Sequence, residues 1–353
     1  MQSSHWEFYG ERWRGRVNFP LCLAPMVGLS HGALRAVLRG YTPAGVKTFW
    51  PTEMLNSRKL AQQVLGQTPE TAKYGDEPGL CPQILGNEEA PIAEAVRRLD
   101  AWGAEAIDIN MGCPVQKALR HNYGVALMGD PVYAAEVVKM TVRNSRLPIS
   151  VKLRAGPQGD FAYLLNFVRG LRDSGASWVT LHPRTPEQMR KGQADWQQIR
   201  KLRESVDFPI IGNGDIQTAD DVFAMLATTG CDQVMSGRAM AARPWLMWQV
   251  AEQLGWAPPE GREGPAPRTP EEEGAEYGRA LRRLVDVSSE LFTPDLALRK
   301  VRFHLRMTAP WLIFGHTLEA LSTKAKTLDE FRPLIEKFFS VPQEMVPKTD
   351  LRQ

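Results

Sequence analysis

The feature that most constrains the fold of this chain is one pattern that occurs eight times between Leu21 and about Met240. Each unit is a short apolar or β-branched run that ends in glycine, proline, asparagine or a charged residue, and an amphipathic helical stretch follows it. Apolar runs of this kind are typical of parallel strands that are buried on both faces. The eight runs span residues 21–28, 48–55, 80–87, 106–113, 149–156, 178–185, 209–216 and 233–240.

The segments between the runs carry helix start and stop signals. Asp130 offers an N-cap and Pro131 follows it at the first helical position, and the helical stretch 90–102 stops at Gly103. Eight strand–helix units in about 220 residues predict an α/β fold, a closed TIM-type (β/α)8 barrel. A doubly wound open sheet is the alternative, but no Gly-x-Gly-x-x-Gly motif follows the first strand.

The chain changes in character after the last unit. Residues 257–274 are rich in proline, glycine and glutamate, which is typical of a linker, and residues 275–339 have helical periodicity with many lysines and arginines. We therefore expect a barrel domain over 1–255, a linker over 256–274 and a helical domain with a tail over 275–353. The cations could form a basic face, although an ordinary solvated helix surface is the simpler interpretation.

The bulk composition narrows the class of protein. The formal net charge is only +3, which decides nothing about nucleic-acid partners. The four cysteines form no Cys-x-x-Cys pair, so we expect neither a metal site nor a disulfide framework. The first 19 residues lack the apolar segment of a secretory signal, and no apolar run approaches the roughly 18 residues that span a bilayer. We expect a soluble, cytoplasmic monomer.

Polar residues gather at the ends of the predicted strands. A barrel carries its chemistry at the carboxyl ends of its strands, and buried strands seldom end in many polar groups, because unpaired polar atoms there cost free energy. We therefore expect one shared site that includes Gln83, Asn110, Cys113, Lys152, Arg154, His182, Arg184, Asn213, Asp215, Gly237 and Arg238.

The seventh and eighth strands end in glycine-containing loops, Gly-Asn-Gly-Asp at 212–215 and Ser-Gly-Arg at 236–238. In barrels, the loops at these two positions often bind phosphate. The glycines allow close approach of the backbone, and Arg238 adds a positive charge. Tight turns are the alternative explanation, but the match of both loops favours a cofactor that carries phosphate.

Lys152 lies within an apolar strand and is expected to point into the barrel mouth. It could form a Schiff base with a carbonyl substrate, place a charge against an electron-rich ring such as a reduced flavin, or form a buried structural ion pair. Gln83 could hydrogen-bond the pyrimidine edge of such a ring, because an amide both donates and accepts.

Cys113 is the cysteine with the strongest indication of a chemical role. It lies in Asn-Met-Gly-Cys-Pro, where Gly112 and Pro114 predict a turn that presents the thiol at the barrel mouth. A protonated thiol can act as a general acid and a thiolate as a nucleophile, and the sequence does not choose between them. Buried cysteines are usually inert, which is the expectation for Cys22, Cys81 and Cys231.

Taken together, these motifs resemble the tRNA-dihydrouridine synthase family. The matching segments appear in the family's order and cover the barrel almost from end to end, and the Asn-x-Gly-Cys-Pro motif is the most specific of them. Residues 296–305 resemble, more loosely, the start of the family's helical RNA-binding domain. The barrel matches are at 24–35, 82–87, 108–114, 151–156, 181–185, 212–216 and 236–238.

The resemblance implies an FMN-dependent oxidoreductase that reduces the 5,6 double bond of specific uridines in tRNA to dihydrouridine. Hydride would pass from reduced FMN to C6, Cys113 would protonate C5, and NADPH would re-reduce FMN. The uridine would be flipped into the barrel mouth. Asn110, Arg154 and Arg184 would contact the substrate. The resemblance assigns FMN to Pro25, Met26, Val27, Gln83, Lys152 and His182, with Asn213, Gly214, Asp215, Gly237 and Arg238 on its phosphate arm.

Two positions depart from the family's pattern: Pro183 replaces a small residue, and residues 121–128 differ from the usual glycine- and alanine-rich run. Four alternatives stay open at this point. They are a flavin barrel that reduces a free pyrimidine or enoate, a synthase that acts on ribosomal RNA, a Schiff-base lyase that uses Lys152, and a non-catalytic RNA-binding protein with the same fold. A flavin absorbance spectrum would separate the first two from the last two.

Overall fold

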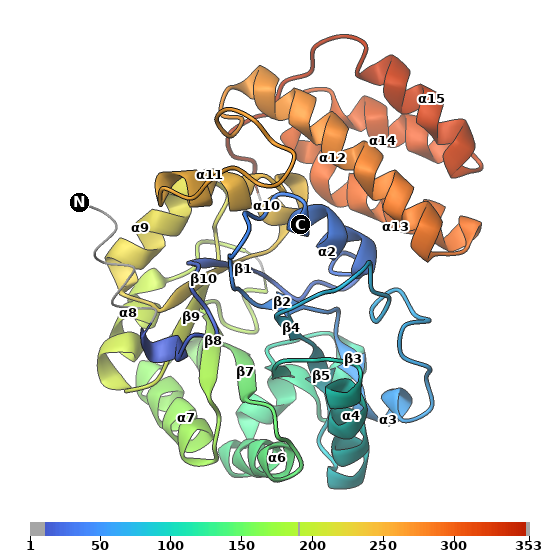
Figure 1. The fold of residues 1–353 in the computed structure, drawn as a ribbon. Coiled ribbons are helices and arrows are strands. Elements are labelled where there is room, and N and C mark those ends of the chain that lie inside the picture. Colours follow the sequence, from blue (N-terminus) through green and yellow to red (C-terminus); the bar gives the residue numbers. More distant parts are fainter. Residues whose placement is uncertain (1–10, 190, 351–353) are drawn as a thin grey trace.

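A computed structural model describes residues 11–189 and 191–350, and its main body is a (β/α)8 barrel (Figure 1). Most of the amino-terminal segment in which we expected no secretory signal lies outside the described residues. Every strand pairing in the two sheets is parallel. The strands are β1 (Leu21–Leu23), β2 (Trp50–Pro51), β3 (Leu55–Asn56), β4 (Leu80–Cys81), β5 (Gln83–Leu85), β6 (Ile107–Met111), β7 (Ile149–Arg154), β8 (Trp178–His182), β9 (Ile210–Asn213) and β10 (Gln233–Ser236).

These ten strands occupy eight barrel positions, because the second and third positions are each divided in two. One sheet runs in the order β1-β10-β9-β8-β7-β6-β5-β3, and β2 pairs separately with β4. The second position is interrupted at residues 52–54, directly after Pro51, and the third at Pro82, which has no N–H to donate to a ladder. Thr48 Oγ1 donates to the carbonyl of Leu21 at 2.7 Å and joins the first two positions. All eight predicted runs contain a barrel strand, so the predicted barrel is confirmed.

Helices on the outside of the barrel begin and end at the predicted signals. Asp130 caps its helix by accepting from the N–H of Tyr133 at 3.0 Å, and Gly103 follows another helix with a φ of +94°. The barrel helices are α2 (Gly32–Arg39), α3 (Ser57–Leu60), α4 (Glu89–Ala101), α5 (Gln116–Leu119), α6 (Pro131–Arg143), α7 (Phe161–Asp173), α8 (Trp196–Ser205), α9 (Ala219–Thr229), α10 (Arg238–Ala242) and α11 (Leu246–Gln253).

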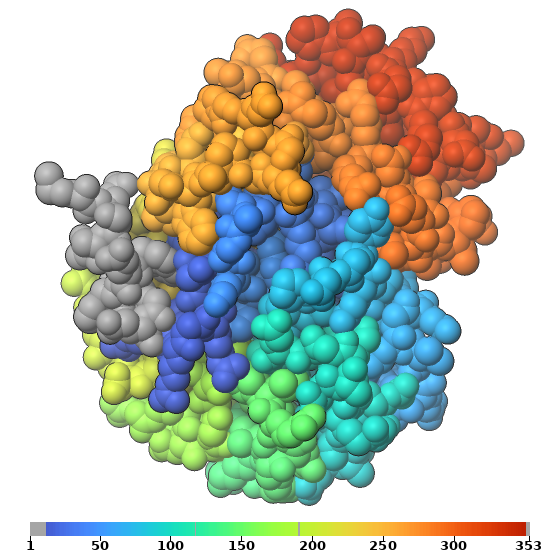
Figure 2. Space-filling view, viewed as in Figure 1, coloured from blue at the N-terminus to red at the C-terminus, as the bar shows by residue number. Residues whose placement is uncertain are grey.

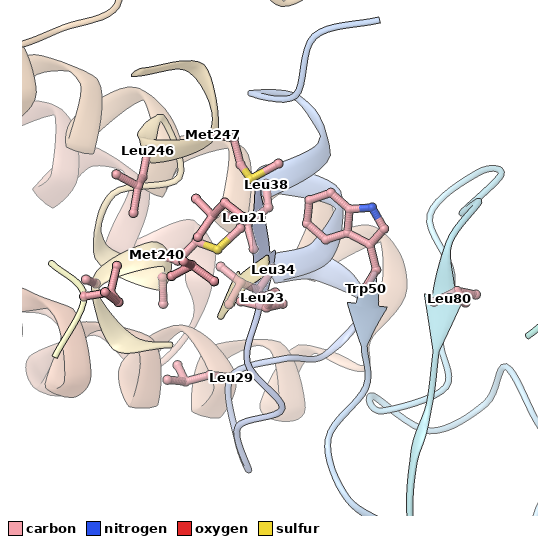
Figure 3. Packing of buried hydrophobic residues seen from close by; sticks show 14 of the residues in the cluster. Leu21, Leu23, Leu29, Leu34, Leu38, Trp50, Leu80, Met240, Leu246 and Met247 are labelled. Carbon is pink, nitrogen blue, oxygen red and sulfur yellow. The ribbon is translucent and has the colours of Figure 1, made fainter. Parts of the chain in front are cut away.

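The apolar core has two parts, one outside the barrel wall and one inside it. Outside, side chains of β1, α2, α10 and α11 pack together, as Figure 3 shows for Leu21, Leu34 and Met247. Inside, three aromatic rings close the amino-terminal end of the barrel. The Trp178 ring stacks on that of Phe49 with centroids 4.6 Å apart, and Trp13 meets it edge-on at 5.5 Å. We call Trp13, Phe49 and Trp178 the aromatic plug.

A helical region of four helices follows the barrel: α12 (Pro270–Leu291), α13 (Pro294–Thr308), α14 (Gly315–Lys324) and α15 (Leu328–Phe338). The start of α12 corrects our linker boundary, because residues 270–274 are helical. Thr269 and Glu272 form a capping box, and Pro270 occupies the first turn. Proline and glutamate, which we assigned to a linker, are here helix-start residues.

The helical region packs directly against the barrel, as Figures 1 and 2 show. Two buried carboxylates of α12 mediate the contact. Glu273 binds Arg243 at 3.1 Å and the indole N–H of Trp245 at 3.0 Å, while Glu276 accepts from the hydroxyl of Tyr41. Among the described residues, no helix combines the length and the apolar character that a bilayer span requires.

Candidate active site

A cavity of about 630 Å³ opens at the carboxyl ends of the barrel strands. It brings together every residue that the sequence assigned to cofactor, substrate or catalysis. These residues are Pro25, Met26, Val27, Gln83, Asn110, Cys113, Lys152, Arg154, His182, Arg184, Asn213, Gly214, Asp215, Gly237 and Arg238. The shared location follows from the topology, because parallel strands place their carboxyl ends at one mouth.

A chain of hydrogen bonds leads from the barrel interior to Cys113. Asp108 Oδ2 accepts from Gln83 Nε2 at 2.6 Å, and Gln83 Oε1 accepts from Asn110 Nδ2 at 2.7 Å. Asn110 Oδ1 then accepts the backbone N–H of Gly112 at 3.1 Å and that of Cys113 at 2.9 Å. The side chain of Asn110 therefore fixes the turn that carries the half-buried thiol, and Asp108 fixes the orientation of the Gln83 amide.

Asp108 is a residue that sequence reasoning missed. Burial raises its pKa to about 6, although hydrogen bonds from Ser150 and Gln83 lower it in part. Ser150 donates to its other oxygen at 2.6 Å. The available signal was a carboxylate in the middle of an apolar strand, two residues before Asn110 and so on the same face.

Two basic side chains from the adjacent strands β7 and β8, Lys152 and His182, line the cavity. Lys152 Nζ donates to Asn213 Oδ1 at 3.0 Å, and burial, with the nearby charge of Arg154, lowers the pKa of Lys152 to about 8. Burial and the charge of Lys152 also hold the pKa of His182 well below its ordinary value. His182 is therefore neutral at pH 7. Its Nε2 lies 3.2 Å from Nη1 of Arg184, which can only donate, so the ring carries its proton on Nδ1.

Arg184 lines the cavity, but its donors are directed into the protein. Its side chain lies 2.7 and 2.9 Å from the two carboxylate oxygens of Asp215, and it also donates to the carbonyls of Gly192 and Lys191. Asp215 accepts in addition from the N–H of Ala194 at 2.7 Å. This pair joins the loop after β8 to the loop after β9.

Arg154 connects two loops of the mouth in a similar way. Its Nε donates to the carbonyl of Gly112 at 2.9 Å, beside Cys113, and its Nη1 donates to the carbonyl of Met189 at 2.8 Å. Arg154 as a whole residue is 8% exposed. The guanidinium thus links the turn of Cys113 to the loop after β8 while it lines the cavity.

Two glycines lie where the loops after β9 and β10 line the cavity, and at both positions a Cβ would lie within 3.0 Å of a neighbouring side chain. A Cβ on Gly214, whose φ is +125°, would lie 2.7 Å from the Cβ of Ala194, and a Cβ on Gly237 would lie 3.0 Å from Sδ of Met26. Only glycine fits at Gly214. Together with the Arg238 charge, these cramped backbone positions suit an anionic group, and the Gln83 amide and the Lys152 ammonium suit a polar ring edge. The residues present therefore fit a flavin mononucleotide. Within residues 11–189 and 191–350, no acidic, histidine or cysteine cluster could hold a metal ion.

Sequence reasoning also missed the part of the cavity wall that α13 forms. Phe303, Arg306 and Met307 of this helix line the same cavity as Cys113. The helical periodicity of the segment predicted the helix, but no local signal shows that the helix reaches the barrel mouth.

A barrel with its polar residues converging at the carboxyl-end mouth has the architecture of a barrel enzyme. The chain belongs to the dihydrouridine synthase family, whose model, described as Dihydrouridine synthase (Dus), matches residues 22–337. The match runs from β1 into α15, and the family resemblance of the sequence is confirmed.

Named relatives agree with this assignment. A probable tRNA-dihydrouridine synthase of Mycobacterium tuberculosis (strain ATCC 25618 / H37Rv) is 31% identical over 326 residues, which cover 90% of this chain and 82% of the relative. Those of Rhizobium leguminosarum bv. phaseoli and Rickettsia prowazekii (strain Madrid E) are 36% and 34% identical, over 63% and 71% of this chain and 69% and 74% of the relatives. A solved histamine dehydrogenase from Rhizobium sp. 4-9 gives a TM-score of 0.49 at 15% identity, over 67% of this chain and 46% of that chain, and adds nothing to the assignment.

Proposed function

We propose that this chain reduces the 5,6 double bond of specific uridines in tRNA to dihydrouridine, with FMN as its cofactor and NADPH as the electron source. The observation that carries the proposal is the position of Cys113. Its thiol lies in one cavity with the amide, ammonium and glycine groups that suit a flavin. Membership of the family and the names of the relatives support the substrate.

The cofactor would be held by groups from six barrel positions. Pro25, Met26 and Val27 would flank it, Gln83 would pair with its pyrimidine edge, and Lys152 and neutral His182 would supply donors to that ring. Because the Asp215 carboxylate is bound to Arg184, Asp215 would contribute its backbone to the phosphate arm. Asn213, Gly214, Gly237 and Arg238 would complete the phosphate arm.

Cys113 would give the proton to C5 of the uracil. One hydride, which FMN supplies when it is bound and reduced, and this one proton saturate the double bond. Asn110 keeps the thiol in place through the backbone of its turn, so the proton is held at a fixed atom. The thiol is half-buried, and water at the mouth can return its proton.

The substrate would meet the protein at the mouth and along the helical region. A uridine in folded RNA must leave its stack to enter a cavity of this kind. Asn110 and Arg154 would contact the uracil, whereas Arg184 would act by holding the loops around it. We place the barrel domain up to residue 255 and an RNA-binding helical domain from Pro270, and we propose a cytoplasmic monomer.

The test is mass spectrometry of RNA from cells that lack the gene, with and without a plasmid copy. Dihydrouridine is expected to disappear from one tRNA position and to return with the wild-type gene but not with Cys113→Ala. Unchanged dihydrouridine at every tRNA position would reject tRNA as the substrate, and a loss from ribosomal RNA would identify that RNA instead. Purified protein without flavin absorbance would reject the cofactor.

A further inference from the structure

A buried carboxylate joins the loop after β1 to helix α13. Glu53, between β2 and β3, accepts the backbone N–H of Gly28 through Oε2 at 2.6 Å and the ammonium of Lys300 through Oε1 at 2.7 Å. The side chains of Glu53 and Lys300 are 4% and 13% exposed. One carboxylate therefore connects three segments that are far apart in the chain.

Gly28 also lies against helix α13, where the ring of Phe303 leaves no space for a side chain. Gly28 has a φ of +83°, and a Cβ there would lie 2.4 Å from Cε1 of Phe303, one turn along α13 from Lys300. Glycine is thus required both by the backbone conformation and by the aromatic ring. Helix α13 rests on the backbone of the β1 loop, and the ion pair holds the loop against it.

This junction forms part of the cavity wall. Residues 25–27, directly before Gly28, line the cavity from the barrel side, and Phe303, Arg306 and Met307 line it from α13. Glu53 and Lys300 are both described by the structure, and neither lines the cavity. The ion pair can therefore affect the site only by positioning the groups that do.

The charges of this junction are costly to bury. Burial raises the pKa of Glu53, while Lys300 and the Gly28 hydrogen bond lower it in part. Burial, followed by the charge of Lys300, holds the pKa of the neighbouring His31 well below its ordinary value. A buried ion pair is often no more stabilising than apolar residues of the same volume. Its presence at the cavity wall is therefore better explained by the geometry it fixes.

We propose that Glu53 and Lys300 are positioning residues, whose ion pair couples the docking of α13 to the placement of the β1 loop at residues 25–28. The helical region then determines the shape of the cofactor site, in addition to any contact with RNA. The relevance of this coupling to uridine reduction rests on the proposed function, but the coupling itself is measurable without it.

The first measurement is amide hydrogen exchange of the holoprotein across residues 24–31. In Lys300→Met, exchange in this segment should be about tenfold faster, because the loop loses an anchor while the rest of the barrel keeps its contacts. Lys300→Arg should restore slow exchange, since it keeps a donor and a charge. The matched control is Arg282→Met, which removes an ion pair with Glu336 between α12 and α15 and should leave residues 24–31 unchanged.

The second measurement concerns the cofactor and the reaction. Lys300→Met is expected to weaken FMN binding by about tenfold, to alter the visible flavin spectrum, and to lower kcat several-fold with little change in KM for tRNA. Lys300→Arg and Arg282→Met should behave as the wild type. A purely structural role would lower the unfolding temperature without moving the spectrum or kcat.

The proposal is overturned if folded Lys300→Met matches the wild type in exchange, FMN affinity and spectrum. Should Lys300→Met fail to fold, the double variant Glu53→Gln/Lys300→Met replaces it, because the double variant leaves no buried unpaired charge. Its exchange, FMN affinity and spectrum are then compared with those of the wild type, and a match overturns the proposal. If wild-type holoprotein reduces no uridine in tRNA while exchange still responds to Lys300→Met, the proposed function fails and the coupling stands.

Discussion

The two ends of the barrel interior are built from the same strands but have opposite chemistry. Along β8, Trp178 belongs to the aromatic plug at the amino end, and His182, four residues later, lines the cavity at the carboxyl end. Along β7, Ser150 lies at the depth of Asp108, and Lys152 lies at the mouth. Distance along a strand, and not the identity of the strand, decides whether an inward side chain serves packing or binding.

The comparison teaches how stability and function are divided in this fold. The plug buries large apolar rings, which favours folding. The mouth instead holds basic groups whose pKa values burial lowers, which means that the fold resists their charged forms. The amino-terminal end of the barrel thus contributes stability, and the carboxyl-terminal end presents polar groups that can bind a ligand.

The strongest test of this division compares cysteines from the two regions. Cys113→Ala at the mouth should lower uridine reduction by a factor of about 10²–10⁴, because it removes the proposed proton donor, while FMN stays bound. Cys22→Ala, in the barrel interior, should change stability slightly and leave the rate unchanged. Single-turnover reduction of tRNA by pre-reduced protein measures both. A Cys113→Ala protein with full activity would remove the distinction.

A substitution in the aromatic plug should have the opposite result, a large loss of stability with little change in FMN binding. Trp178→Ala should lower the free energy of unfolding by about 3–5 kcal/mol, since the cavity it leaves is surrounded by fixed neighbours. FMN affinity of the folded fraction should change little. Urea titration and flavin fluorescence measure the two quantities. A loss of FMN affinity as large as the loss of stability would show that the two ends are not separable.

A smaller effect should follow from the titration of Lys152. Its pKa of about 8 means that the ammonium is charged at pH 7 and loses its proton as the pH rises through 8. FMN affinity should therefore fall by about tenfold above pH 8, by the loss of a charged hydrogen bond. In Lys152→Arg the fall should vanish over this range, because the guanidinium stays charged. An unchanged pH profile in Lys152→Arg would contradict the assignment of the fall to Lys152.

The smallest effect is an acid sensitivity of the cavity end and of the helical junction. Burial lowers the pKa of His304 to about 4, against an ordinary value near 6.5, and it lowers those of His31 and His182 as well. At these three histidines the unfolded chain therefore binds more protons between pH 6.5 and 4, and their contribution to stability should fall as the pH drops through that window, while the raised pKa of Asp108 acts in the opposite direction.

Urea unfolding at pH 7.5 and pH 5 measures this acid effect. His304→Gln should reduce the difference between the two pH values, whereas His121→Gln, at an exposed side chain, should not. A pH dependence that His304→Gln leaves untouched would assign the effect to other groups.

Much of the fold was predictable because its signals are local. Each of the eight apolar runs holds a barrel strand, Asp130 caps the start of α6, and Gly103 follows the end of α4, as their residue types require. The breaks after Pro51 and at Pro82 divide two barrel positions, a detail that the apolar pattern concealed. The start of α12 was misplaced, since proline and glutamate serve both linkers and helix starts.

The residues that line the cavity were predictable, but the hydrogen bonds and ion pairs between them were not. The strand-end rule placed Cys113, Lys152 and His182 in one cavity. It did not show that Arg184 is bound to Asp215, or that Asp108 lies beneath Gln83. These pairings depend on the register of neighbouring strands, which no single run of sequence contains.

The sequence by itself determined the strands, the helices and the set of residues at the mouth, because periodicity and turn residues act over a few positions. Only the tertiary structure decided that α13 lines the cavity. Lys300 and Glu53 are 247 residues apart in the chain, and their contact at 2.7 Å exists only because the barrel closes and the helical region docks. Contacts of that span depend on the packing of whole elements, and packing is a property of the folded molecule.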